Sequence, residues 1–369
     1  MVHRACWLAA LVIAATQAFD ALPGQALTTE EQTRLVGDRT AWDAIFVDDL
    51  PELVAEGFAW PEGPLWIEED GALLFSDTIT GKLHCFRDGT VDVLREHAGG
   101  CAVDVEGGCD PEQLEPGSNG LALVGKRLVV CQHGARRLVF LDLETGTAEV
   151  IVDRARRKRG TSRGRLNGPN DVVASEDGAT LYFTDPYYAL LEKTRPADGR
   201  YADAKSELGS AGIYRYDVRK KDLELLDDTL SRPNGLAIVN GSHLVVSDCC
   251  QGHSRACPAG EARWAVWPFR EDGYLSKRKE KRTIVHRDFV KKGCADGLAF
   301  HEPSQTLVAS CPGGVCLVDL DAGDVVAKLH LGRSVSNVAF GGGYAWITAD
   351  KSLWRARLRE DRVERRREL

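Results

Sequence analysis

The sequence predicts an all-β fold, a six-bladed β-propeller, on three observations. A short polar turn followed by an apolar run recurs six times, with 41 to 64 residues between successive copies, about the length of one four-stranded blade. A second run of β-branched, aromatic and aliphatic residues follows each copy, for example LLFS, LYFT and LVVS. No convincing helical period interrupts these runs before the C-terminal end. Because a blade cannot bury both faces alone, we expect one cooperative domain closed by radial repetition.

The composition is that of a globular protein with a full core. Of 369 residues, 43% are apolar and 28% are charged, which excludes disorder, collagen and a membrane bundle. The net charge is −8, and phosphate binding requires a basic face. We therefore expect neither nucleic acid nor a membrane as a partner, and we expect a monomer.

The first residues resemble a secretory signal peptide, residues 1–18. His3 and Arg4 precede an apolar run, Ala5–Ala15, that is too short to span a bilayer, and Thr16-Gln17-Ala18 supplies small residues for cleavage. The alternative is a buried amphipathic helix. A signal peptide implies a secreted or lumenal protein, with a lead-in at 19–43, the propeller at 44–358 and a charged tail at 359–369.

The ring requires a strand from the beginning of the chain to close it. The runs Ala44–Val47 and Leu53–Phe58 are predicted to supply a strand that pairs with the last blade. The basic segment Arg154–Arg165 holds seven cationic residues and no acid, and we interpret it as a solvated loop rather than a nucleic-acid patch.

The cysteine count fits an oxidising compartment. If Cys6 is cleaved away with the signal peptide, ten of the 11 cysteines remain, and an even set in an exported chain indicates disulfides. The pairs close enough in sequence to staple loops are Cys101 with Cys109, Cys249 or Cys250 with Cys257, and Cys311 with Cys316. Asn240-Gly241-Ser242 is a glycosylation sequon or simply a tight turn between strands.

One polar residue recurs at the turn of each copy. The innermost strands of a propeller all start at one end of the central axis, so these side chains are expected to point at one spot. Two carboxylates and four amides of this kind suit a hard cation such as Ca²⁺, Mg²⁺ or Mn²⁺. The alternative is that Asn, Asp and Gly mark turns, which explains every position except Glu62. The six residues are Glu62, Asn119, Asn170, Asn234, Asp296 and Asn337.

Several motifs together resemble the gluconolactonase and regucalcin-like (senescence marker protein) family. The resemblance extends from about Phe58 to Thr348 and is closest to the bacterial gluconolactonase branch, which Ser118-Asn119-Gly120-Leu121 and the segment Cys131–Arg137 resemble most. The motifs that carry it are FAWPEGPLW from Phe58, RLNGPND from Arg165, FTDPYY from Phe183, RPNGLA from Arg232 and ADGLA from Ala295.

The resemblance implies a hydrolase that opens a sugar lactone with one divalent ion on the propeller axis. It implies Glu62, Asn170, Asn234 and Asp296 as metal ligands, and it places Asn119, His133 and Asn170 at the substrate. Ca²⁺ is the expected ion, with Zn²⁺, Mn²⁺ and Mg²⁺ as alternatives.

The chemistry can also be argued from the residues. A metal with open positions polarises the lactone carbonyl for attack by water. Asp296 is the expected catalytic base, and His133 is either a proton carrier or a structural histidine of the turn.

Two other function classes share the predicted fold. A non-catalytic secreted propeller that binds a protein or a sugar would not need Glu62 and Asp296 on one axis. A propeller like strictosidine synthase would work without a metal. Serine hydrolase and zincin chemistry are disfavoured because Gly-x-Ser-x-Gly and His-Glu-x-x-His do not occur.

Overall fold

The computed structural model describes residues 34–101, 109–194, 203–249, 261–287 and 293–359. The expected signal peptide, most of the lead-in and tail, and the cysteines Cys6, Cys250 and Cys257 lie outside these ranges. No helix of the described ranges is long and apolar enough to cross a bilayer.

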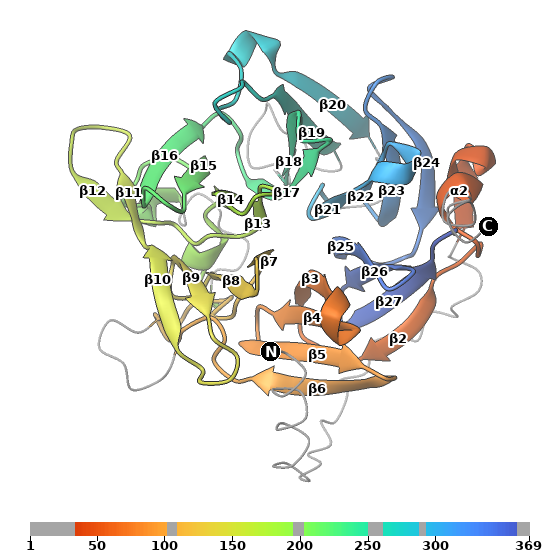
Figure 1. Ribbon diagram of the computed structural model, residues 1–369, viewed down its shortest axis with the longest axis horizontal. Helices are drawn as coiled ribbons and strands as arrows, with labels where there is room; N and C mark the ends of the chain where they lie inside the picture. The colour runs from red at the N-terminus through yellow and green to blue at the C-terminus, as the bar shows by residue number, and fades with distance from the viewer. Residues whose placement is uncertain (1–33, 102–108, 195–202, 250–260, 288–292, 360–369) are drawn as a thin grey trace.

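Six antiparallel sheets surround a central axis and confirm the six-bladed β-propeller (Figure 1). From the axis outward, the first three blades consist of β3 Pro61–Ile67, β4 Ala72–Asp77, β5 Lys82–Arg87 and β6 Thr90–Arg95; β7 Leu121–Val124, β8 Arg127–Gln132, β9 Arg137–Leu141 and β10 Ala148–Val152; and β13 Val172–Ala174, β14 Thr180–Asp185, β15 Gly212–Asp217 and β16 Asp222–Asp227.

The last three blades follow the same order. They consist of β17 Pro233–Val239, β18 His243–Asp248, β19 Glu261–Pro268 and β20 Arg282–Arg287; β21 Leu298–His301, β22 Thr306–Cys311, β23 Gly314–Asp319, β24 Asp324–His330 and the added edge strand β1 Arg34–Gly37; and β25 Val335–Gly341, β26 Tyr344–Ala349, β27 Ser352–Arg357 and β2 Glu52–Glu56. Short 3-10 turns lie at Glu68–Asp70, Tyr188–Leu190, Arg278–Glu280 and Glu302–Ser304.

The ring is closed by the N-terminal strand β2, which pairs antiparallel with β27 in the last blade. This confirms the closing role predicted for the run from Leu53. The prediction for Ala44–Val47 holds only for its second half: Ala44 and Ile45 end the helix α2 (Arg39–Ile45), whereas Phe46 and Val47 pair with Leu358 and Arg357 at the end of the last blade. Asp38 caps that helix by accepting hydrogen bonds from two backbone N–H groups, and the helical spacing of Trp42, Ile45 and Phe46 buries all three against blades five and six.

The basic segment is a hairpin rather than a loop. β11 (Arg154–Arg156) pairs with β12 (Arg163–Arg165), and Ala155 lies opposite Gly164. These two small residues are buried, whereas Arg154, Arg156 and Arg163 are exposed. The prediction of a solvated surface holds for the charged side chains, but the alternating small residues give the segment a strand pattern.

The hydrophobic core lies between neighbouring blades. The second strands β4 and β14 are buried along their whole length, since both faces of such a strand pack against an adjacent blade. At the junction of the last and first blades, the indole rings of Trp66 and Trp346 stack with centroids 5.7 Å apart. This packing fixes the angle of each blade and hence the place where its inner strand meets the axis.

Three disulfides join described cysteines. Cys101–Cys109 and Cys311–Cys316 confirm two predicted pairs. Cys249 pairs with Cys294 rather than Cys257, because the end of β18 lies beside the turn into the next blade, and the predicted pair Cys250–Cys257 lies outside the described residues. Cys131 is a buried free thiol, so the even count does not mean complete pairing. Three disulfides are consistent with an oxidising compartment.

Candidate active site

The six polar residues predicted at the axis lie at equivalent places at the start of the inner strands. Glu62, Asn234 and Asn337 belong to β3, β17 and β25. Asn119, Asn170 and Asp296 each stand two residues before β7, β13 and β21. Five of the six are buried, and Asp296 has intermediate exposure. Figure 1 shows the inner strands that carry them arranged around the centre of the ring.

The glycine after an axial residue lets the blades approach closely at the axis. A Cβ atom on Gly235 would lie 2.6 Å from the backbone oxygen of Asp296 in the next blade. A Cβ atom on Gly120 would lie 2.9 Å from the backbone oxygen of Asn170, which accepts a 2.7 Å hydrogen bond from the N–H of that glycine. Equivalent contacts join Gly63 to Asn119 and Gly297 to Asn337. Of these four glycines, only Gly63 has a positive φ. The glycine of the recurring Asn-Gly and Asp-Gly pairs is therefore needed for the close approach of neighbouring blades.

The two axial carboxylates each contact an axial amide. Asn337 Nδ2 donates to Glu62 Oε2 at 3.4 Å, and the Asn234 side chain hydrogen-bonds the carboxylate of Asp296. Burial raises the pKa of Glu62 to about 8, with the charges of Asp171 and Glu115 adding to the effect. Burial and the charges of Glu62, Glu115 and Asp171 raise the pKa of Asp296 well above its ordinary range. The axis therefore gathers negative charge at an unfavourable electrostatic cost.

Asp171 is a buried acid that the sequence argument did not assign to the site. It occupies the position that glycine has in other blades, and its Oδ1 accepts from the N–H of Val172 at 2.9 Å. Its Oδ2 accepts from the N–H of Leu236 in the next blade at 3.3 Å. Burial raises the pKa of Asp171 to about 6. The exchange of glycine for aspartate at a repeat position was the available sequence signal.

Glu115 is a second acid that the sequence did not indicate, because it lies in the connection between the first two blades. Its Oε2 lies 3.3 Å from Nε2 of His133, whose side chain is fully buried. His133 also contacts the backbone oxygen of Pro169 through Nδ1 at 3.1 Å. The structure thus brings His133 beside the residue that precedes Asn170.

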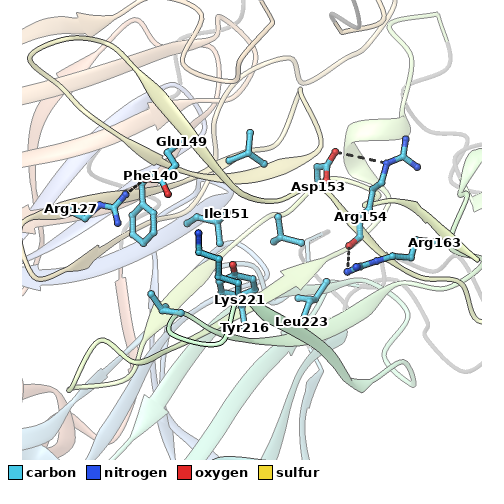
Figure 2. Close-up of a pocket in the computed structure, with 13 residues that line it drawn as sticks. Arg127, Phe140, Glu149, Ile151, Asp153, Arg154, Arg163, Tyr216, Lys221 and Leu223 are labelled. Atoms are coloured by element: carbon cyan, nitrogen blue, oxygen red, sulfur yellow. Dashed lines mark hydrogen bonds and ion pairs between the residues drawn. The ribbon is translucent and has the colours of Figure 1, made fainter.

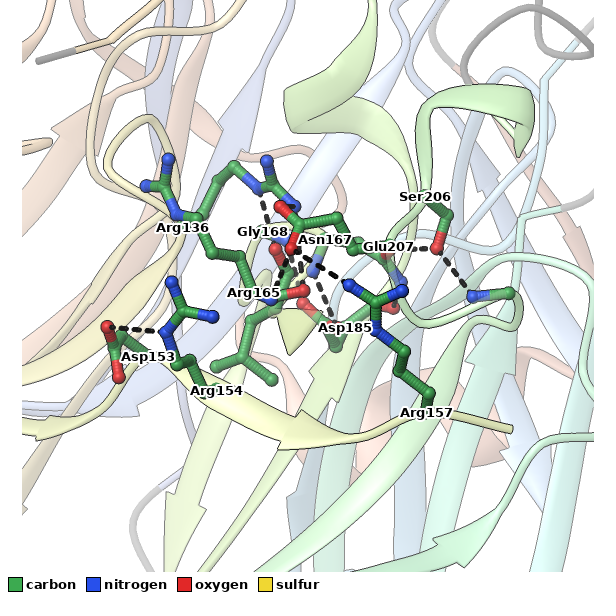
Figure 3. A network of polar contacts seen from close by, with 12 residues as sticks. Arg136, Asp153, Arg154, Arg157, Arg165, Asn167, Gly168, Asp185, Ser206 and Glu207 are labelled. Atoms are coloured by element: carbon green, nitrogen blue, oxygen red, sulfur yellow. Dashed lines mark hydrogen bonds and ion pairs between the residues drawn. The ribbon is translucent and has the colours of Figure 1, made fainter. Parts of the chain in front are cut away.

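A buried aspartate positions the turn that leads to Asn170. Asp185, the last residue of β14, accepts hydrogen bonds from the backbone N–H groups of Asn167 at 2.9 Å and Gly168 at 2.7 Å (Figure 3). The Asn167 side chain in turn donates to the backbone oxygens of Asp185 and Ser210. Two charge-assisted bonds of this kind hold a short loop more firmly than neutral ones.

The same device recurs in three other blades. Asp77 accepts from the N–H of Ala59 and Trp60 before Glu62, and Asp248 accepts from the N–H of Arg232 before Asn234. Asp350 accepts from the N–H of Ser334 before Asn337. We call Asp77, Asp185, Asp248 and Asp350 the clamp aspartates. Each fixes the backbone two or three residues ahead of an axial side chain.

An arginine cluster contacts the turn that leads to Asn170 in the third blade. Arg136 Nε donates to the backbone oxygen of Leu166 at 2.6 Å, and Glu207 accepts from the backbone N–H of Arg165 at 3.0 Å. Arg136 and Arg157 also lie within 3.5 and 3.9 Å of the Glu207 carboxylate (Figure 3). These contacts connect the basic hairpin to the loop that carries Asn170.

The axial donors fit a hard divalent cation. Among the described residues, Asn119 Oδ1 is buried without a hydrogen-bond partner, and no ion pair neutralises Glu62, Asp171 or Asp296. No three His, Cys, Asp or Glu side chains of the described ranges converge on one point as a metal site. An ion on the axis would therefore depend on amide oxygens as well as carboxylates, a donor set that Ca²⁺ accepts.

A cavity lies at the outer rim, away from the axial residues. It has a volume of about 350 Å³ and lies between the outer strands of blades two and three. Figure 2 shows Arg127 beside Phe140 and Glu149 at one side, and Tyr216 and Leu223 from the other blade. It has an apolar floor and a charged rim, and none of the axial residues lines it.

Comparisons with known proteins find similar proteins along nearly the whole chain. Residues 60–351 match the family described as the SMP-30/gluconolactonase/LRE-like region. A gluconolactonase of Zymomonas mobilis is 30% identical over 381 aligned positions, covering 97% of this chain and 97% of that protein. The structure of a gluconolactonase from Xanthomonas campestris matches with a TM-score of 0.67 and 26% identity, covering 92% of this chain and 99% of that one. Strictosidine synthase-like protein 8 of Arabidopsis thaliana is 30% identical over 117 positions, covering 31% of this chain and 27% of that protein.

Proposed function

Since the chain belongs to the SMP-30/gluconolactonase/LRE-like family, we propose that it is a hydrolase that opens sugar lactones with the help of one divalent ion. The observation that carries the proposal is the ring of axial side chains, in which two carboxylates and several amides from six blades surround one axis. The long match to the Zymomonas gluconolactonase supports the substrate class. The match to the strictosidine synthase-like protein is confined to a third of the chain and gives the metal-free alternative less support.

Glu62, Asn170, Asn234 and Asp296 would hold the ion, of which Ca²⁺ suits the oxygen donors best. When bound, it would polarise the lactone carbonyl. The two carboxylates balance the charge of a divalent ion, which relieves the repulsion that raises the pKa of Glu62 and Asp296 after the effect of burial.

The chain's own residues then orient the substrate and move protons. The hydrogen bond from Asn234 orients the Asp296 carboxylate, and Asp296 accepts a proton from the attacking water. The unpartnered Oδ1 of Asn119 accepts a hydrogen bond from a sugar hydroxyl. Burial of the other axial residues keeps bulk water away from the reacting carbonyl and leaves the half-buried Asp296 at the open side.

We also propose that the protein is exported. The apolar N-terminal run with its cleavage pattern and the three disulfides support this location. N-terminal sequencing of the mature protein tests it, and a mature chain that begins at Met1 would refute it.

The function is tested by measuring proton release from glucono-δ-lactone with purified protein in a pH-stat, before and after chelation and after Ca²⁺ is restored. We expect activity that chelation abolishes and Ca²⁺ restores, and a loss of at least about 100-fold in kcat/KM for Glu62→Gln and Asp296→Asn. The matched control is Glu69→Gln, which removes an exposed carboxylate paired with Lys126. Activity that survives chelation and both substitutions would refute the metal-dependent mechanism.

A further inference from the structure

We propose that Glu115 and His133 form a pair that carries one shared proton and delivers it to the ring oxygen as the lactone opens. The inference rests on the proposed lactone hydrolysis. It adds Glu115 to the site, and it gives His133, which the sequence left as either a proton carrier or a structural histidine, the role of a general acid in a pair. The pair is built from two separate connections: Glu115 precedes the second blade, and His133 follows its second strand, β8.

The donors and acceptors around the two side chains point to a proton held between them. The Pro169 oxygen can only accept, so the 3.1 Å contact places a hydrogen on Nδ1 of His133. A neutral imidazole protonated at Nδ1 presents a lone pair at Nε2. That atom lies 3.3 Å from Oε2 of Glu115 and makes no hydrogen bond among the described residues, and two unprotonated acceptors this close together would repel.

One added proton resolves the conflict in either of two ways. It can sit on Nε2 and make an imidazolium beside a carboxylate, or it can sit on Glu115 and make a carboxylic acid that donates to Nε2. The side chain of His133 is fully buried and that of Glu115 is 20% exposed, so bulk solvent does not reach the ring. The carbonyl of Pro169 also prevents the ring from switching to the other tautomer.

The pair stands at the axial site. Pro169 directly precedes Asn170, and the negative charge of Glu115 acts on both Glu62 and Asp296. Asp185 at the end of β14 also interacts electrostatically with His133 and with Arg136. Tyr188 lies close enough for Glu115 and Asp296 to raise its pKa, although burial is the larger cause.

The proton balance gives the pair a role distinct from that of Asp296. As the water oxygen bonds to the carbonyl carbon, one water proton passes to Asp296. As the bond between that carbon and the ring oxygen breaks, the ring oxygen takes the shared proton of the pair and leaves as a hydroxyl. The proton on Asp296 then returns to the pair through solvent, so the sum is lactone plus water giving the hydroxy acid.

A general acid matters most when the leaving oxygen is a poor leaving group. An aliphatic sugar lactone releases an alkoxide and needs the proton, whereas an aryl lactone such as dihydrocoumarin releases a phenoxide that is stable without it. We therefore expect the pair to contribute about 100-fold or more to kcat on the sugar lactone and less than about tenfold on the aryl lactone.

Two variants separate this role from a structural one. His133→Asn keeps an N–H donor for the Pro169 oxygen but lacks Nε2, and Glu115→Gln removes the acid at nearly constant shape. The matched control is Glu112→Gln, a carboxylate of the same connection whose backbone oxygen accepts from Lys193. We expect both variants, but not the control, to lose kcat on glucono-δ-lactone far more than on dihydrocoumarin, with unchanged melting temperature within a few degrees.

An active parent enzyme whose His133→Asn variant loses equal activity on the two lactones, or none, would overturn the role of the pair and leave the proposed function standing. A parent that hydrolyses neither lactone would overturn both. The 15N chemical shifts of the His133 ring test the shared proton independently of any activity assay. We expect them to show a hydrogen-bonded proton between Nε2 and Glu115 that the variant Glu115→Gln abolishes. A neutral ring protonated only at Nε2 would overturn the assignment.

Discussion

Asp185 ends the second strand of blade three and Asp350 directly follows the second strand of blade six, and each carboxylate accepts a hydrogen bond from the backbone that leads to an axial asparagine. Asp185 accepts at 2.7 Å from Gly168, ahead of Asn170, and Asp350 accepts at 3.2 Å from Ser334, ahead of Asn337. Because Asn170 is a proposed ligand and Asn337 is not, this pair of clamp aspartates separates an effect on the metal site from an effect on the fold.

Asp185→Asn is expected to weaken Ca²⁺ binding about tenfold, measured by titration calorimetry. The amide keeps one acceptor but turns an N–H toward the second backbone N–H, which costs about 1 to 3 kcal/mol at a buried position and shifts the turn before Asn170. The matched variant Asp350→Asn should keep the affinity within about twofold. Equal losses of affinity in the two variants would show that the clamp supports the fold without positioning the ligand.

Gly235→Ala is expected to destabilise the ring at the axis by about 3 kcal/mol, at the upper end of the usual cost of overpacking. The added Cβ would meet backbone atoms of Asp296 and Gly297 at 2.6 Å, and backbone cannot rotate away. Gly241→Ala is the control, since that glycine has a φ of +63° and no atom within 4 Å of an added Cβ; its cost should be about 1 kcal/mol. Chemical denaturation measures both, and equal costs would refute the close-approach argument.

The fold and the axial residues could be predicted because they repeat. A polar residue at the start of all six inner strands, followed by glycine in four of them, reveals blade number, register and axis together. Glu62 could therefore be placed on the same axis as Asn337 despite a sequence separation of 275 residues. The reason for the glycine was not available, because a tight turn and a close approach of two backbones leave the same mark in a sequence.

Features that occur once could not be predicted in this way. Glu115 lies in a connection of irregular length, and only the folded chain shows that it meets His133. The partner of Cys249 is 45 residues away in sequence, beyond the near neighbours that spacing suggests. Helix α2 is too short for a periodic signal, so its buried residues looked like part of a strand.

His84 is expected to make the protein less stable as the pH falls. Burial lowers the pKa of His84 to about 4, and its Nε2 has no hydrogen-bond partner among the described residues. Between pH 6.5, the ordinary pKa of histidine, and pH 4, the imidazole of His84 is protonated in the unfolded chain but stays neutral in the folded chain. The stability that is present above pH 6.5 is therefore lost as the pH falls toward 4.

His84→Phe removes this linkage and keeps a flat ring against Phe75, whose ring stacks on His84 at 5.0 Å. Relative to the parent, the variant should gain about 2 kcal/mol of unfolding free energy between pH 7.5 and pH 5. Denaturant titrations at both values measure the difference, and other titrating groups cancel in the comparison. A difference that does not change with pH would contradict a neutral buried imidazole.

The disulfide Cys249–Cys294 is expected to matter for both stability and the site. It joins the end of β18 to the position two residues before Asp296, so it restrains the proposed base from the neighbouring blade. In the chain-entropy account, closing a loop over a sequence separation of 45 residues stabilises the fold by about 4 kcal/mol, against about 2 kcal/mol for the separation of 5 in Cys311–Cys316.

The double variant Cys249→Ser, Cys294→Ser should therefore lose more stability than Cys311→Ser, Cys316→Ser, and it alone should also bind Ca²⁺ more weakly. Calorimetric melting and Ca²⁺ titration test the two parts separately. A large loss of stability with unchanged Ca²⁺ affinity would mean that the disulfide joins the two blades without positioning Asp296.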